Sequence, residues 1–131
     1  MILNKFTFNY FLILFSLIPV SIIIGSAASV FNILLIDLSF LILIAYRRDF
    51  FFLKKEPIIY LLALYIYLIF NSFISLEFSE GVLRNFGFIR IIILFAAFNY
   101  FFLDDKFSRK VFKFWLIVII VVLVDVFIES L

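Results

Sequence analysis

The stretch from Phe6 to Tyr46 reads FTFNYFLILFSLIPVSIIIGSAASVFNILLIDLSFLILIAY and contains one charged residue, Asp37, in 41 positions. A bilayer's hydrocarbon core needs about 20 apolar residues of helix. At about 1.5 Å per residue, the stretch is long enough for two crossings and too long for one. The small residues of GSAAS, 25–29, predict the turn between these crossings. Pro19 falls inside the first crossing, where neighbouring helices or water can bond the carbonyl that a proline frees.

The composition of the whole chain indicates the same class of protein. Of its 131 residues, 68% are apolar and 15% are charged, and the mean hydropathy is +1.34. Soluble domains are about 45–50% apolar and about 25% charged. Because the chain has no cysteine and no histidine, disulfides, thiolate metal sites and the usual neutral-pH proton carrier are excluded. We predict an all-α, multi-pass transmembrane bundle in contact with the lipid bilayer, with no catalytic residue, metal, cofactor or nucleic-acid partner.

Three further apolar runs follow the first two. The five predicted transmembrane spans cover about 8–24, 30–46, 58–75, 86–103 and 114–131. Polar loops are expected at RRDFFFLKKEP (47–57), LEFSEGVLRNFGF (76–88) and DDKFSRKVFK (104–113). The polar residues Asn71, Ser72 and Ser75 are expected only to end the third span.

The basic residues predict the orientation of these spans. Loops rich in Lys and Arg stay in the cytoplasm. With the N-terminus cytoplasmic, that side holds Lys5, Arg47, Arg48, Lys54, Lys55, Lys106, Arg109, Lys110 and Lys113, and the other side holds Arg84 and Arg90. Tyrosine and tryptophan favour membrane interfaces. The cytoplasmic ends of the five spans carry Tyr10, Tyr46, Tyr60, Tyr100 and Trp115, which agrees with a cytoplasmic N-terminus and an external C-terminus.

The last apolar run is short for a complete crossing. Counted from Phe114 it has 18 residues, which is about 27 Å of helix. Two acids, Asp125 and Glu129, lie in its second half. We therefore expect the chain to be one transmembrane domain, 1–131, that forms the N-terminal part of a longer membrane protein.

Charged residues inside a membrane are costly and are functional candidates by default. Measured from the cytoplasmic end of each span, Asp37 and Asp125 lie about 15 Å deep, and Arg90 and Glu129 lie about 20 Å deep. Arg84 is expected at the outer interface. We predict an ion pair between Arg90 and Asp125, with Glu129 as a second partner and Asp37 as the competing acid.

Other interpretations of these charges stay open. The two arginines can extend to the outer headgroups. Asp125 and Glu129, four residues apart on one helix face, can serve only to orient helices. Asp37 can be a protonated, hydrogen-bonded acid within a helix pair.

Three patches of sequence carry a resemblance to a known family. They are LIPVSIIIGSAASVFNILLIDLSFLI (17–42), with its proline and Gly-Ser turn, LRNFGFIRIIILFAAF (83–98), with its arginines, and VVLVDVFIES (121–130), with an acid followed four residues later by Glu129 where the family often has glutamine. The chain resembles the N-terminal portion of the O-antigen ligase and polymerase family. These are multi-span bacterial glycosyltransferases that use undecaprenyl-diphosphate-linked glycans.

The resemblance implies a bacterial inner-membrane protein that contributes to lipopolysaccharide biosynthesis. Family members act without metal or nucleotide, and their key Arg and His residues lie in a later periplasmic loop. The present chain has no His, so it is expected to be inactive alone. Arg84 and Arg90 would bind the lipid diphosphate, because guanidinium groups bind such oxygens bidentately. The expected protein partner is the remaining C-terminal helices or a neighbouring subunit. The alternative is a non-enzymatic multi-span protein, either a transporter or a subunit of a complex.

Overall fold

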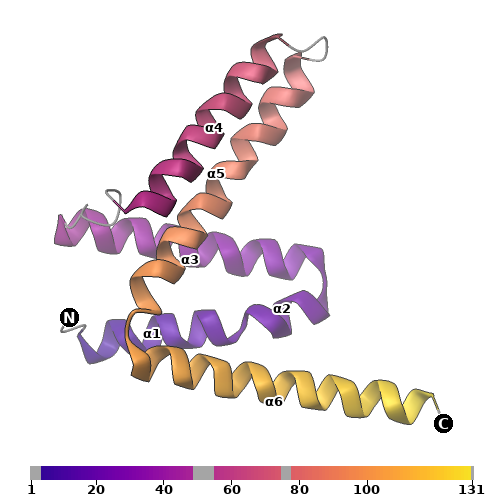
Figure 1. The fold of residues 1–131 in the computed structure, drawn as a ribbon. Coiled ribbons are helices and arrows are strands. Elements are labelled where there is room, and N and C mark those ends of the chain that lie inside the picture. Colours follow the sequence, from indigo (N-terminus) through magenta and orange to yellow (C-terminus); the bar gives the residue numbers. More distant parts are fainter. Residues whose placement is uncertain (1–3, 49–54, 75–77, 131) are drawn as a thin grey trace. The chain divides into compact units, whose positions relative to one another are not determined.

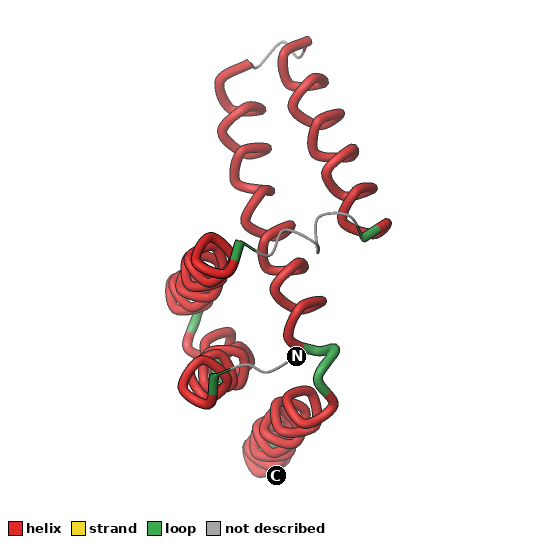
Figure 2. Tube along the Cα trace, turned by 90° about the vertical axis from the view of Figure 1, so that its left-hand side faces the viewer, coloured by secondary structure: helices red, strands yellow, loops and turns green. Residues whose placement is uncertain are grey.

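The computed structural model describes residues 4–48, 55–74 and 78–130, and every regular element in these ranges is an α-helix (Figures 1 and 2). The helices are α1 (Lys5–Ser16), α2 (Ile18–Ile24), α3 (Ser26–Arg47), α4 (Glu56–Ile74), α5 (Phe78–Phe101) and α6 (Asp105–Glu129). Four segments are long and apolar enough to cross a membrane: α1 with α2, α3, α4 and α6. A shorter apolar helical segment, Gly87–Phe101, lies in α5. The predicted all-helical multi-pass class is confirmed.

The first predicted turn is shorter than expected. Helix α2 ends at Ile24, and α3 already begins at Ser26, so the GSAAS segment contributes a single residue to the turn. That residue, Gly25, has φ +138°, a conformation that residues with a Cβ rarely adopt. The serines and alanines of the segment are the first residues of α3 instead.

Two of the predicted polar loops are largely helical. Helix α5 starts at Phe78 rather than near Phe86, and α6 starts at Asp105 rather than near Phe114. The Asp104 side chain caps α6 by accepting hydrogen bonds from the backbone N–H groups of Lys106 and Phe107, at 2.9 and 3.4 Å. With 25 residues, α6 is about 37 Å long, so it is long enough to cross a bilayer completely.

The start of α6 is amphipathic, which explains why hydropathy alone misplaced it. Phe107 and Val111 are fully buried. Basic side chains occupy its exposed face: Lys106, Arg109, Lys110 and Lys113. One face of the helix is therefore packed against the protein. The opposite face carries the basic residues that are typical of a loop in a hydropathy analysis.

The chain forms two compact units, which we describe separately. Unit 1 comprises residues 1–36 and 101–131, and unit 2 comprises residues 37–100. In unit 1, α1 and α2 pack against α6. A cluster of aromatic rings fills this contact, with Phe107 at its centre and fully buried. The Phe107 ring lies 5.3 to 5.7 Å from those of Phe8, Phe15, Phe101 and Phe102.

An interruption between α1 and α2 organises unit 1. Pro19 lacks an N–H, so the carbonyl of Phe15, four residues earlier, loses its helical donor. Nε1 of Trp115 in α6 donates a 2.9 Å hydrogen bond to this oxygen. One residue earlier, the carbonyl of Leu14 accepts a 3.3 Å bond from Nδ2 of the buried Asn32 in α3. The expectation that a neighbouring helix bonds the carbonyl freed by Pro19 is confirmed.

The order of contacts shows that α1 and α2 run parallel to α6. Lys110 lies over the Phe8 ring at 5.6 Å, and Trp115 bonds Phe15 further along both helices. Still further along, Val20 and Ile23 line a groove with residues of α6 that extend to Ile128. Two parallel crossings must be separated by an odd number of crossings. This register therefore supports a crossing by α5 as well as by α3 and α4.

In unit 2, α4 and α5 form an antiparallel hairpin (Figure 1). Nδ2 of Asn85 in α5 donates to the carbonyl of Leu68 in α4 at 3.0 Å and also to Oγ of Ser72. The Ser72 hydroxyl in turn donates to the Leu68 carbonyl at 2.9 Å. Gly81 lies against this serine, since a Cβ on Gly81 would be 3.6 Å from Cβ of Ser72. Small residues and amides of this kind join helices in membranes.

These contacts correct the expectation that Ser72 only ends the third span. Ser72 is buried at 4% exposure and bonds the neighbouring helix, and Asn71 also lies within α4. Ser75 lies outside the described residues. Because Asn85 reaches across from α5, the polar start of that helix joins the two helices.

The five-crossing topology can be tested with reporter fusions that end at Gly25, Lys54, Glu77, Asp104 and Leu131. Alkaline phosphatase and green fluorescent protein, which are active on opposite sides of the membrane, should report outside, inside, outside, inside and outside. The third position is decisive, because cytoplasmic activity there would contradict the crossing by α4. The parallel register of α1 and α6 would then need another explanation.

The Trp115 bond can be tested with a double-mutant cycle. Trp115→Phe should lower the free energy of unfolding by about 1 kcal/mol, because the Phe15 carbonyl loses its donor. In a Pro19→Ala background, the backbone N–H that the substitution restores can bond this carbonyl. The same Trp115 substitution should then cost less, as measured by denaturant titration in micelles. If Trp115→Phe lowers the free energy of unfolding equally in both backgrounds, the indole stabilises the protein by ring packing and not by its hydrogen bond.

Candidate functional site

The described residue that best fits a functional site is Asp37, about half-way along α3. Only 4% of its surface is exposed, and its neighbours Ile36 and Phe40 are fully buried. Neither carboxyl oxygen of Asp37 has a hydrogen-bond partner among the described residues. The structure thus confines an ionisable group to an apolar interior without the bonds that usually accompany one.

In the same unit, α5 lies beside the part of α3 that carries Asp37, because Ile89 and Ile93 line a groove with Phe40. The basic residue in that stretch of α5 is Arg90. Arg90 is exposed, and it makes no hydrogen bond to either oxygen of Asp37. The structure therefore brings Arg90 towards the acid that the sequence suggested as the competing partner. Because the Arg90 guanidinium group makes no hydrogen bond to Asp37, it is available to bind another anion.

Arg84, the second predicted lipid-binding arginine, lies on α5, but its side chain is outside the described part of the structure. Arg84 and Arg90 are six positions apart in the sequence. In an α-helix this spacing places their Cα atoms about 9 Å apart along the axis and on different faces.

The two acids of α6 lie in unit 1. Asp125 and Glu129 are both exposed and one helical turn apart. Asp125 lines a mainly apolar groove of about 620 Å³ with Val20 and Ile23 of α2. Since Arg90 belongs to unit 2, the predicted Arg90–Asp125 ion pair stays a prediction, as does the role of Glu129.

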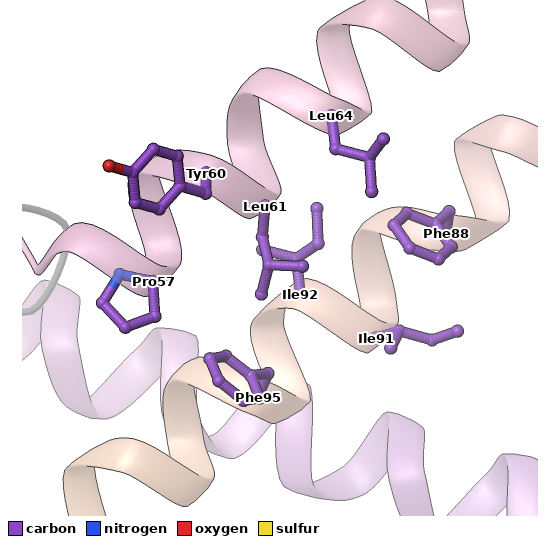
Figure 3. A pocket seen from close by; sticks show the side chains of 8 residues that line it. All are labelled: Pro57, Tyr60, Leu61, Leu64, Phe88, Ile91, Ile92 and Phe95. Carbon is purple, nitrogen blue, oxygen red and sulfur yellow. The ribbon is translucent and has the colours of Figure 1, made fainter.

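Two apolar grooves flank the helix that carries Arg90. The first, of about 410 Å³, lies between α4 and α5 and is lined by Pro57, Tyr60, Leu61, Leu64, Phe88, Ile91, Ile92 and Phe95 (Figure 3). The second, of about 450 Å³, lies among α3, α4 and α5 and includes Phe40 and Leu41, one turn beyond Asp37. Such surfaces suit hydrocarbon chains. No group of three or more His, Cys, Asp or Glu side chains that could bind a metal occurs within residues 4–48, 55–74 and 78–130.

The five predicted aromatic interface residues divide into two groups. Tyr10, Tyr46 and Tyr60 are exposed, as membrane-interface side chains would be. Tyr100 is 7% exposed and its ring packs against Phe40 at 5.7 Å. Trp115 is half-buried and bonds Phe15. The last two residues therefore contribute to packing within the protein.

Sequence reasoning overlooked Asn32 and Asn85, which both bond a carbonyl of another helix. A signal for them exists, since each is an isolated amide close to an apolar run and such residues often join membrane helices. Asn99 has the same signal but bonds Phe95 of its own helix. The pattern alone cannot distinguish these two uses.

No protein-family model, curated protein or solved structure matches this chain.

The partner of Arg90 can be identified with two double-mutant cycles at alkaline pH, where carboxyl groups lose their protons. Arg90→Ala combined with Asp37→Asn should show a coupling of about 0.5 kcal/mol or more in the free energy of unfolding, because the two charges attract. The cycle with Asp125→Asn tests the predicted ion pair. Coupling between Arg90→Ala and Asp125→Asn would support the predicted ion pair, and zero coupling would contradict it. Zero coupling with Asp37 would show that the attraction contributes nothing to stability.

Proposed function

We propose that this chain is the N-terminal membrane part of a glycosyltransferase like the O-antigen ligases and polymerases. In this proposal it binds undecaprenyl-diphosphate-linked glycan in the bacterial inner membrane and transfers nothing by itself. The observation that carries the proposal is Arg90, an exposed cation on α5, the helix whose other faces line two apolar grooves. The ligand has a matching chemistry, because its diphosphate is anionic and its polyisoprenyl chain is apolar.

The role of each group follows from this match. A guanidinium group binds phosphate oxygens bidentately and is weakly hydrated, so Arg90 is suited to the diphosphate. The groove between α4 and α5 would accept part of the isoprenoid chain, with Phe88, Ile91 and Phe95 on one wall. The absence of histidine from the sequence supports a binding role, since the family's transfer chemistry resides in a later Arg- and His-containing loop.

A second candidate is a non-enzymatic membrane protein, either a transporter or a subunit of a complex. The observation that favours it is Asp37, a buried acid in a membrane-spanning helix. Acids at such positions typically belong to ion or proton pathways or pair with another helix. This candidate requires no bound glycan carrier.

Lipid binding separates the two candidates. The folded protein in nanodiscs should bind undecaprenyl diphosphate more tightly than undecaprenol, as measured by native mass spectrometry. Arg90→Ala should remove most of that preference, because a charge-assisted bidentate contact contributes about 1.5–3 kcal/mol, or more than tenfold in affinity. Arg109→Ala, which removes an exposed arginine from the start of α6, is the matched control and should leave the preference intact.

Equal affinity for the two lipids, or a preference that survives Arg90→Ala, would refute the proposal and favour the non-enzymatic candidate. The expected lack of activity has its own readout. Expressed in a strain without O-antigen ligase, the chain should leave the lipid-linked glycan unattached. Restored attachment would contradict a purely binding role.

A further inference from the structure

The surroundings of Asp37 do not suit a permanent negative charge. Its side chain is 4% exposed, and both carboxyl oxygens are buried without a hydrogen-bond partner among the described residues. It lies in the interior of α3, a helix that is long and apolar enough to cross a membrane. An ionised, unbonded carboxylate is strongly disfavoured in such surroundings, whereas the protonated acid is neutral and much less costly to bury.

The charged and titratable groups near Asp37 are few. Helix α5 lies beside this part of α3, because Ile89 and Ile93 line a groove with Phe40 of α3. Arg90 is the basic residue in that stretch of α5. Tyr100 of the same helix contacts Phe40, which lies one turn beyond Asp37 in α3. The buried tyrosine of α4 is Tyr65. Among these groups, only Arg90 carries a charge at neutral pH.

The groups around Asp37 favour a proton over a metal cation as its ligand. A bound metal cation would need several oxygen or nitrogen ligands, and in the described part of the chain Asp37 belongs to no cluster of three acid, His or Cys side chains. The positive charge of Arg90 would also repel a metal cation. A proton needs only the carboxylate, and the guanidinium group can replace it as the compensating positive charge.

We propose that Asp37 is an intramembrane proton-binding site with two states. In one state Asp37 is protonated and Arg90 points away from it. In the other state Asp37 has released its proton, and the Arg90 guanidinium moves to pair with the carboxylate. The inference stands without the proposed glycan carrier, because it depends only on Asp37 and Arg90.

This arrangement links proton binding to any event at Arg90. An anion that binds the guanidinium group withdraws the competing charge from Asp37 and so favours proton uptake. By reciprocity, protonation of Asp37 favours binding of that anion. The site would therefore couple proton binding at a buried carboxyl of α3 to anion binding at an exposed cation of α5.

Infrared difference spectroscopy tests the proposal with the whole protein in lipid. The carbonyl stretch of a protonated carboxylic acid should be present at neutral pH in the wild type and absent from Asp37→Asn. In Arg90→Leu the band should persist to higher pH than in the wild type, because the competing charge is gone. Arg109→Leu and Asp105→Asn, which change exposed residues at the start of α6, are the controls and should leave the Asp37 band and its pH dependence unchanged.

Carbodiimide labelling gives an independent measurement. Dicyclohexylcarbodiimide adds to protonated carboxyls in apolar surroundings, and peptide mapping should locate the product at Asp37. Identical carbonyl bands in the wild type and Asp37→Asn, at both neutral and acidic pH, would overturn the proton site. An unchanged pH dependence in Arg90→Leu would overturn the two-state exchange.

Discussion

The hydrogen bond between the Trp115 indole and the Phe15 carbonyl is the contact on which unit 1 depends. Pro19 frees this carbonyl inside an apolar span, where no bulk water is present to bond it. Three helices meet at the interruption, because Asn32 bonds the adjacent Leu14 carbonyl and Trp115 bonds Phe15. The proline thus creates an acceptor that a side chain of α6 satisfies in the folded protein.

Unit 2 is joined in the same way by different residues. In lipid, the removal of apolar surface from water does not drive helices together, so close packing and hydrogen bonds between helices must do so. Asn85 and Ser72 supply the bonds between α4 and α5, and Gly81 lies in contact with Ser72. Isolated polar side chains therefore act as specific links within a chain that is otherwise 68% apolar.

The helical, multi-pass membrane class could be predicted because apolar runs about 20 residues long have few alternatives to a membrane span. The starts of α5 and α6 could not be predicted in this way, because a hydropathy analysis assigns charged stretches to loops. The Asp104 cap and the Asn85 contact extend these helices into polar sequence. The sequence identified Asp37 and Arg90 as candidates. It could not reveal that both lie in unit 2, since depth along a helix contains no information about which helices are neighbours.

The parallel pairing of α1 with α6 has a consequence for biosynthesis. The residues joined by the Trp115 bond are 100 positions apart in the sequence. At ribosomal rates of about 5–20 residues per second, Trp115 is made on the order of 5–20 s after Phe15. The first helix thus enters the bilayer before its partner exists, and the proline-freed carbonyl must use a temporary donor, such as water or the insertion machinery. Unit 1 is therefore completed only after α3, α4 and α5 have been made, although α1 and α2 are made before them.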